Sequence, residues 1–152
     1  MIVWRLAEAR YARDLSGIGS RIAGGRWNEV GSAVLYASEH LALAALETLV
    51  HAPGLLQERF LDKVALQLFL PDHLNIHKVN KLPGSMKGQG LLNWCRSLGQ
   101  SWIREEKTAL LRVPSVVVPE EFNLIVNCSH PDMKHLRIKS SRPFEFDKRL
   151  FR

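Results

Sequence analysis

The clearest hydrophobic pattern in the chain runs from Lys63 to Leu70, where every second residue is aliphatic and Pro71 follows. An alternation of period two is the pattern of a β-strand with one buried face. Shorter runs rich in β-branched and aliphatic residues predict further strands at 2–6, 33–37, 109–113, 115–118, 123–127 and 136–138. The sequence therefore predicts strands near both ends of the chain.

Two stretches have helical character instead. Residues 39–51 form one, with Ser38 as the expected N-cap and Pro53-Gly54 as the stop. The other covers residues 89–107, with apolar side chains on one side and an internal Gly99 that weakens it. Helices between groups of strands favour an α+β fold with a bent, mostly antiparallel β-sheet and flanking helices. Residues 1–152 are expected to form one domain.

A glycine-bearing passage between the first two strands carries Gly17, Gly19, Gly24 and Gly25. Its first two glycines have the spacing of a dinucleotide-binding GxGxxG motif, but Ile22 occupies the third glycine position, and no strongly apolar strand precedes Gly17. We therefore interpret the passage as a loop that folds back on itself rather than as a Rossmann turn.

Composition indicates an ordinary globular protein: 152 residues, 46% hydrophobic and 24% charged. No apolar run approaches the roughly 20 residues needed to span a bilayer, and the N-terminus is charged too early for a secretion signal. Cys95 and Cys128 form no CxxC pair; a disulfide between them stays open, although free thiols are expected. We expect a cytoplasmic protein without membrane contact.

The formal net charge is +6, and the stretch from Lys134 to Arg152 is its most basic part. Such a balance suits anionic partners, yet a solvated surface explains the charges equally simply. Neither RNP1 nor GXXG is present, so no direct nucleic-acid binding is expected. The pairs His73/His77 and His130/His135 lack an HExxH setting or a cysteine pair, so no metal site is expected.

Residues 24–51 hold the most informative candidate chemistry. Arg26 lies among glycines and offers a planar, permanently charged fork suited to phosphate, unless it is merely a surface arginine. Tyr36 is either a core residue or a ring that packs on a flat heterocycle. Glu47 borders the apolar side of its helix, where it either pairs with His51 or stabilises positive charge in a transition state.

Ser115 follows Pro114 and precedes a valine run, so the pattern places it at the start of a strand. It lacks a GxSxG context and an ordered Ser-His-Asp arrangement. A hydrogen-bonding role for Ser115 is therefore favoured over nucleophilic catalysis.

Several of these segments together resemble the RES-domain family, the toxins of RES–Xre toxin–antitoxin systems. The resemblance rests on segments in family order along nearly the whole chain: Trp4-Arg5-Leu6, Gly25-Arg26-Trp27-Asn28, Val34-Leu35-Tyr36-Ala37, residues 46–51, Val113-Pro114-Ser115, residues 123–131 and residues 146–151. The family's Asn-Pro-x-His pattern is here Asn127-Cys128-Ser129-His130, without the proline.

The resemblance implies a fold similar to ADP-ribosyltransferase toxins and cleavage of the nicotinamide–ribose bond of NAD, by a glycohydrolase or phosphorolase. NAD is then the substrate, and no cofactor is expected. Glu47, Arg26 and Ser115 are the implied catalytic residues, and Arg26, Tyr36, Arg5, Ser115 and Asn127 the implied NAD-binding residues.

The same resemblance implies an Xre-like antitoxin that covers the active site, and it leaves room for a homodimer within the complex. Three alternatives stay open at this point: an ADP-ribosyltransferase that modifies a cellular protein, a basic RNA-binding or RNA-cleaving toxin that uses the tail arginines and a histidine, and a catalytically inactive interaction domain.

Overall fold

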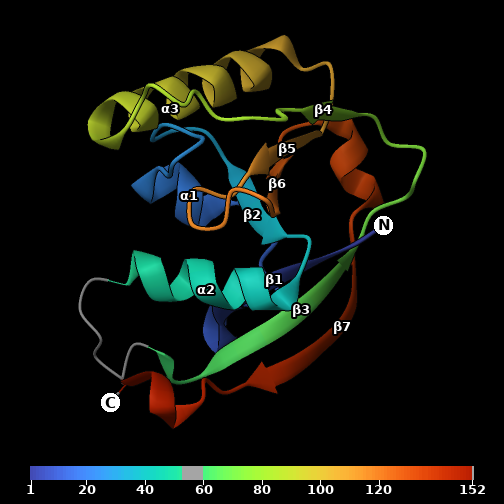
Figure 1. Cartoon of the computed structure of the whole chain (residues 1–152). Helices are drawn as coiled ribbons and strands as arrows, with labels where there is room; N and C mark the ends of the chain where they lie inside the picture. Colours follow the sequence, from blue (N-terminus) through green and yellow to red (C-terminus); the bar gives the residue numbers. More distant parts are fainter. Residues whose placement is uncertain (53–59, 152) are drawn as a thin grey trace.

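The predicted strands assemble into one seven-stranded sheet in the order β4-β5-β6-β2-β1-β3-β7 (Figure 1). The computed structural model describes residues 1–52 and 60–151. The strands are β1 (Ile2–Glu8), β2 (Val34–Ser38), β3 (Lys63–Phe69), β4 (Ile76–Lys78), β5 (Leu110–Pro114), β6 (Phe122–Asn127) and β7 (Arg137–Phe144). Among these strands, β4 and β5 are parallel and the other neighbours are antiparallel. The prediction of an α+β fold on a mostly antiparallel sheet is confirmed.

Three α-helices accompany the sheet in the described residues: α1 (Ile18–Ala23), α2 (Leu41–His51) and α3 (Gly88–Glu105). Short 3₁₀ helices are η1 (Ala9–Tyr11), η3 (Pro131–His135) and η4 (Lys148–Phe151). Figure 1 shows α2 crossing the sheet at β1 and β2, with α3 over the half that contains β5 and β6. The helix predicted at 89–107 is thus α3. No described helix is long and apolar enough to cross a membrane.

The sheet is nearly divided at its centre, between β1 and β2. These strands share a single residue pair, Trp4 with Ser38, whereas β1 pairs with β3 from Ile2 to Glu8. The β4-β5-β6-β2 half and the β1-β3-β7 half therefore diverge from one contact. The sheet bends, as predicted, because these two strands diverge. The divergence also opens space between them.

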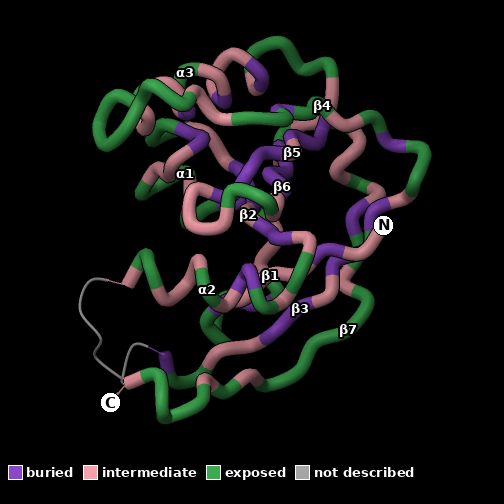
Figure 2. Tube along the Cα trace, viewed as in Figure 1, coloured by how far each residue is buried: buried purple, intermediate pink, exposed green. Residues whose placement is uncertain are grey.

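Two apolar clusters follow from the alternation along the strands. Side chains of both halves meet in the first cluster, which includes Val3, Leu66 and Leu124. The second cluster lies between the β5-β6-β2 face and α3, and includes Trp27, Cys95 and Ile125. Figure 2 shows the buried residues concentrated along the central strands, with the outer strand β7 largely exposed. Cys95 and Cys128 are free.

Three segments have a secondary structure that differs from the prediction. The glycine-bearing passage contains the short helix α1, and the polar stretch 72–88 contributes β4. Residues 115–118, predicted as a strand, form bends after β5. There the Ser115 Oγ accepts hydrogen bonds from the backbone N–H groups of Val117 and Val118, at 3.0 Å each, which turns the chain away from the sheet.

The start of α2 also differs from the prediction. Ser38 is the last residue of β2 and not an N-cap; the N-cap position is His40, whose side chain makes no capping hydrogen bond. The Ser38 hydroxyl is used elsewhere, as described below. The predicted stop at Pro53-Gly54 lies outside the described residues.

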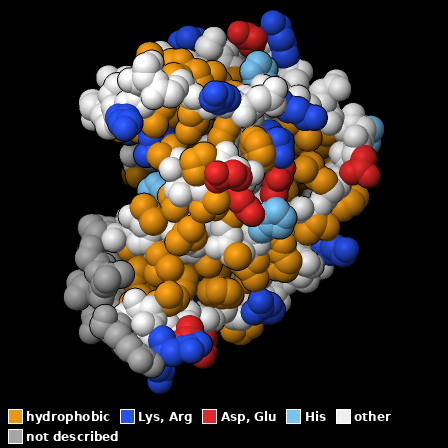
Figure 3. All heavy atoms as spheres, viewed as in Figure 1, with side chains coloured by type: hydrophobic (Ala, Val, Ile, Leu, Met, Phe, Trp, Pro, Cys, Tyr) orange, Lys and Arg blue, Asp and Glu red, His pale blue; other side chains and the backbone are white. Residues whose placement is uncertain are grey.

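The basic C-terminal segment is partly packed through its aromatic residues. Phe144 and Phe146 contact each other edge to face, and Phe60 lies 5.0 Å from Phe151 between ring centroids. On the face shown in Figure 3, Lys and Arg side chains are dispersed among other residues rather than gathered into one patch.

Candidate active site

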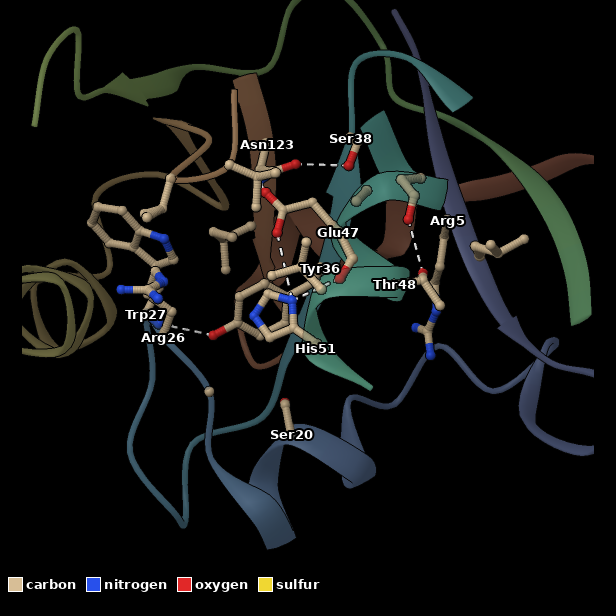
Figure 4. Close-up of a pocket in the computed structure, with 18 of the residues that line it drawn as sticks. Arg5, Ser20, Arg26, Trp27, Tyr36, Ser38, Glu47, Thr48, His51 and Asn123 are labelled. Carbon is tan, nitrogen blue, oxygen red and sulfur yellow. Dashed lines mark hydrogen bonds and ion pairs between the residues drawn. The ribbon is translucent and has the colours of Figure 1, made fainter. Parts of the chain in front are cut away.

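A cavity of about 490 Å³ lies where β1 and β2 diverge. Its walls come from β1, α1, the loop after α1, β2, α2, the turn after β5, and β6. The lining side chains that could bind a ligand or take part in a reaction include Arg5, Arg26, Tyr36, Glu47, His51 and Asn123 (Figure 4). Four of the predicted site residues, each from a different element, therefore meet in one cavity: Arg5, Arg26, Tyr36 and Glu47.

Glu47 reaches the cavity because α2 is anchored by its first turn. Leu43 and Ala44 are buried in that turn, and Glu47 is the next residue on the same side of the helix. Its side chain is 18% exposed. Within the described residues, its Oε1 accepts hydrogen bonds from the Ser115 Oγ and the Asn123 Nδ2, both at 2.7 Å. The carboxylate is thus partly desolvated and held by two donors.

His51 lies one turn further along α2. Its Nδ1 is 2.7 Å from the Glu47 backbone carbonyl oxygen, to which it donates, and 3.6 Å from Glu47 Oε2. The ring therefore borders the carboxylate without a short side-chain hydrogen bond to it. The predicted proximity of the two residues is correct.

Ser115 does not line the cavity. It is fully buried, and its Oγ both accepts from the two valine N–H groups and donates to Glu47. The expectation that Ser115 contacts substrate is thus not met by this structure. Ser115 contacts the cavity wall only indirectly, through its hydrogen bond to the Glu47 carboxylate.

The loop that presents Arg26 is fixed by its neighbours. The Gly25 carbonyl oxygen accepts from Arg96 Nε at 2.9 Å, and the Trp27 N–H donates to the Tyr36 hydroxyl at 3.0 Å. A Cβ on residue 25 would lie 2.5 Å from that hydroxyl oxygen, so only glycine fits there. Arg26 therefore projects from a rigid loop rather than from a free surface segment.

Tyr36 uses its hydroxyl group entirely within the protein. The hydroxyl donates to Asn28 Oδ1 at 2.7 Å while it accepts from Trp27. Burial raises the pKa of Tyr36 to about 12, against the opposing effect of the Trp27 hydrogen bond. The hydroxyl stays protonated at neutral pH, so a ligand in the cavity would meet the ring of Tyr36.

Arg5 lies across the cavity from Arg26, with Tyr36 and Glu47 between them in the close-up (Figure 4). Its Nη1 is buried and is the one such side-chain atom without a hydrogen-bond partner in the part of the chain that the structure describes. Burial lowers the pKa of the Arg5 guanidinium, an effect that nearby Cys128 and Asp14 oppose. Because Arg5 lines the cavity, its positive charge would attract an anionic group there.

Asn127, one of the predicted NAD-binding residues, does not line this cavity. It occupies the end of β6 opposite Asn123 and pairs with Val34. Its Oδ1 accepts from the Ser129 N–H at 3.0 Å and caps the following turn. Asn127 therefore stabilises the turn after β6, and its side chain is not available to a ligand in the cavity.

Sequence reasoning missed three polar residues that build the site: Asn28, Ser38 and Asn123. Each is buried or half-buried and hydrogen-bonded to another element or across a loop. The available signal was a polar side chain within or beside an apolar strand, which must find a partner when buried. No group of three or more His, Cys, Asp or Glu residues that could hold a metal occurs among residues 1–52 and 60–151.

Comparison with known proteins gives a consistent result. Residues 2–147 match the family described as RES domain. The "Prs ADP-ribosylating toxin" of Sphingobium sp. is 41% identical over 98% of this chain and 96% of its own length, and the "Toxin Res" of Photorhabdus laumondii is 30% identical over 99% and 97%. A chain in the crystal structure of the M. tuberculosis MbcT–MbcA toxin–antitoxin complex superposes with a TM-score of 0.74 at 17% identity, covering 95% of this chain and 84% of that chain.

Proposed function

The chain belongs to the RES domain family, and we propose that it is the toxin of a toxin–antitoxin pair and cleaves NAD at the nicotinamide–ribose bond. The observation that carries the proposal is the meeting of two arginines, an aromatic ring and a partly desolvated carboxylate in a single cavity. The names of the relatives in Sphingobium and Photorhabdus support the toxin part of the proposal.

The two arginines supply the charge that a dinucleotide requires. A pyrophosphate carries two negative charges, and guanidinium groups bind phosphate oxygens in a bidentate manner. Arg26 is presented by a fixed loop, and Arg5 lines the same cavity from β1. In the proposed complex Arg26 binds the pyrophosphate, Arg5 provides the second cationic contact, and the Tyr36 ring packs against nicotinamide.

Glu47 supplies electrostatic stabilisation of the reaction. The ribose C1′–N bond breaks with its electron pair going to the nicotinamide nitrogen, so neutral nicotinamide leaves and positive charge develops on the ribose ring. The Glu47 carboxylate, already oriented by Ser115 and Asn123, faces that charge without reorganisation. An oxygen of water or of inorganic phosphate then bonds to C1′; water loses one proton to solvent in this step, whereas phosphate bonds through an oxygen that carries no proton.

A second candidate is transfer of ADP-ribose to a cellular protein. It uses the same Arg26, Tyr36 and Glu47 and differs only in the acceptor. The name of the Sphingobium relative, "Prs ADP-ribosylating toxin", favours this candidate. An RNA-directed activity has no comparable support, because the cavity lies apart from the basic C-terminal segment.

The experiment that separates these reactions is a product analysis of the purified protein with NAD. Formation of ADP-ribose in phosphate-free buffer identifies hydrolysis. Formation of ADP-ribose-1-phosphate when phosphate is added identifies phosphorolysis. Transfer of label from biotinylated NAD to proteins of a lysate identifies ADP-ribosylation. If folded protein that is free of bound partner forms none of these three products, the proposal is contradicted. A separate experiment tests the proposed antitoxin, an Xre-like protein that covers the cavity. Such a protein should co-purify with this chain, and its addition should abolish NAD turnover.

A further inference from the structure

We propose that Asn123, oriented by Ser38, is a positioning residue that dedicates one oxygen of Glu47 to the protein and leaves the other for the substrate. The inference rests on the proposed function, since it assigns the substrate-facing atom of the same carboxylate. It is carried by a chain of short hydrogen bonds that joins the end of β2, the start of β6 and α2 (Figure 4).

The direction of each hydrogen bond follows from Glu47. An ionised carboxylate only accepts hydrogen bonds, so the Asn123 atom at 2.7 Å from Oε1 is the amide nitrogen Nδ2. The carbonyl Oδ1 of Asn123 then faces the Ser38 Oγ, also at 2.7 Å, and must accept from it. The Ser38 hydroxyl, which is 3% exposed, therefore locks the amide in the one orientation that suits the carboxylate.

Ser115 completes the arrangement from the other side. Its Oγ accepts from Val117 and Val118, so its single proton is directed to Oε1. Oε1 thus accepts two hydrogen bonds, whereas Oε2 accepts none from the residues the structure describes and lies 3.6 Å from His51 Nδ1. The geometry assigns Oε2 as the oxygen that faces the ribose.

The physical effect of Asn123 is to fix the position of the carboxylate, because its N–H group donates to one chosen oxygen. The other charged or titratable groups that line the cavity are His51 on the same helix, Arg5 on β1, Arg26 on the loop before β2 and Tyr36 on β2. None of these donates to Oε1, so Asn123 and Ser115 are the donors that hold that oxygen among the described residues.

The decisive variant is Asn123→Asp, which keeps the shape of the side chain and replaces the donor by a second carboxylate. Two carboxylates at hydrogen-bond distance share a proton, and the pair takes up that proton at higher pH than a single carboxylate does. We expect the acidic limb of the kcat/KM profile for NAD to move upward by at least about one pH unit. Asn93→Asp, an equal charge change on an exposed residue of α3, is the control and should retain the wild-type profile.

Ser38 provides a second, independent test. Ser38→Ala frees the Asn123 amide, and we expect kcat to fall by about tenfold, while Ser38→Thr retains a hydroxyl and should restore most of it. Circular dichroism and thermal unfolding establish that each variant is folded. Should Asn123→Asp not fold, the alanine and threonine variants at position 38 decide the question.

The inference is overturned if the pH profile of Asn123→Asp superimposes on that of the wild type, or if both Ser38 variants have the kcat of the wild type. In either case, nicotinamide release by the wild type would still support the proposed function. If the wild type releases no nicotinamide, a carbon-13 NMR titration of the Glu47 carboxyl carbon replaces the kinetic readout. There, the same upward movement of protonation in Asn123→Asp supports the inference, and identical titration curves refute it.

Discussion

Substitution of Gly99 by alanine places a methyl group against the backbone of the loop that carries Arg26. Gly99 lies in the interior of α3, and a Cβ there would be 1.8 Å from the Trp27 carbonyl oxygen and 2.7 Å from its carbonyl carbon. Such contacts occur in proteins only beyond about 3.0 Å. Because the obstacle is backbone rather than a flexible side chain, α3 and residues 26–28 must separate.

The net cost combines two opposing effects. Alanine favours a helix interior over glycine by roughly 0.5–1 kcal/mol, whereas forced overpacking of a core costs typically about 1–3 kcal/mol. We expect Gly99→Ala to lower the free energy of unfolding by about 1–2 kcal/mol. Displacement of a positioning loop by about 1 Å can cost roughly 100-fold in rate, so we expect NAD turnover to fall by a similar factor.

The matched control is Gly90→Ala on the same helix, where an added Cβ meets nothing within 4 Å. This variant should be as stable as the wild type or slightly more stable, with unchanged turnover. Urea unfolding and nicotinamide release measure both effects. A Gly99→Ala protein as stable and as active as Gly90→Ala would refute the claim that α3 fixes the Arg26 loop by direct backbone contact.

The remaining predictions concern Arg26 and Tyr36. Arg26→Ala should weaken NAD binding and lower kcat/KM by at least about tenfold through loss of the phosphate contact, whereas Arg21→Ala, at an exposed arginine of α1, should leave both unchanged; equal affinity for the two variants would contradict the assignment. Tyr36→Phe leaves Asn28 Oδ1 and the Trp27 N–H without their partner and should cost about 1–3 kcal/mol of stability. Since folding raises the pKa of Tyr36 to about 12 from 10.0, its contribution to wild-type stability is complete below pH 10 and is lost as the pH rises toward 12, by at most about 1.4 kcal/mol per unit. Unfolding measured across that range should show a smaller decline for Tyr36→Phe, and parallel declines would contradict the burial argument.

Those parts of the fold that depend on local periodicity could be predicted from the sequence. The alternation at 63–70 reflects a strand whose residues Leu66 and Leu68 are completely buried, and the apolar side of residues 89–107 packs as α3. Glu47 was identifiable because it is a carboxylate on the flank of an otherwise apolar helix. These signals lie within single elements and need no knowledge of tertiary structure.

The errors share a physical cause, which is that a specific contact overrode the local propensity of the segment. The Ser38 hydroxyl has the chemistry of an N-cap, but its partner is Asn123, 85 residues away. The valine run after Ser115 has strand propensity, yet the Ser115 Oγ bends it into a turn that orients Glu47. Gly99 looked like a weakness of its helix, whereas its missing side chain admits the Trp27 carbonyl group.

Asn127 illustrates a different limit, that of inference by resemblance. Its place in a family pattern suggested ligand binding, while the structure uses it to cap a turn at the far end of β6. Asn123, four residues earlier on the same strand, is the asparagine that reaches the cavity. A pattern of residues along a strand does not by itself tell which end of that strand faces the site.

The central claim is that the Glu47 carboxylate enables cleavage of the nicotinamide–ribose bond, and release of free nicotinamide from NAD, followed by proton NMR, tests it most directly. The wild type is compared with Glu47→Gln, which keeps the side chain's shape and removes its charge. We predict release by the wild type and a loss of at least about 100-fold in Glu47→Gln, with both proteins equally folded. Equal release by the two proteins would remove Glu47 from the mechanism, and no release by the folded wild type, with or without phosphate and an acceptor lysate, would contradict the account as a whole.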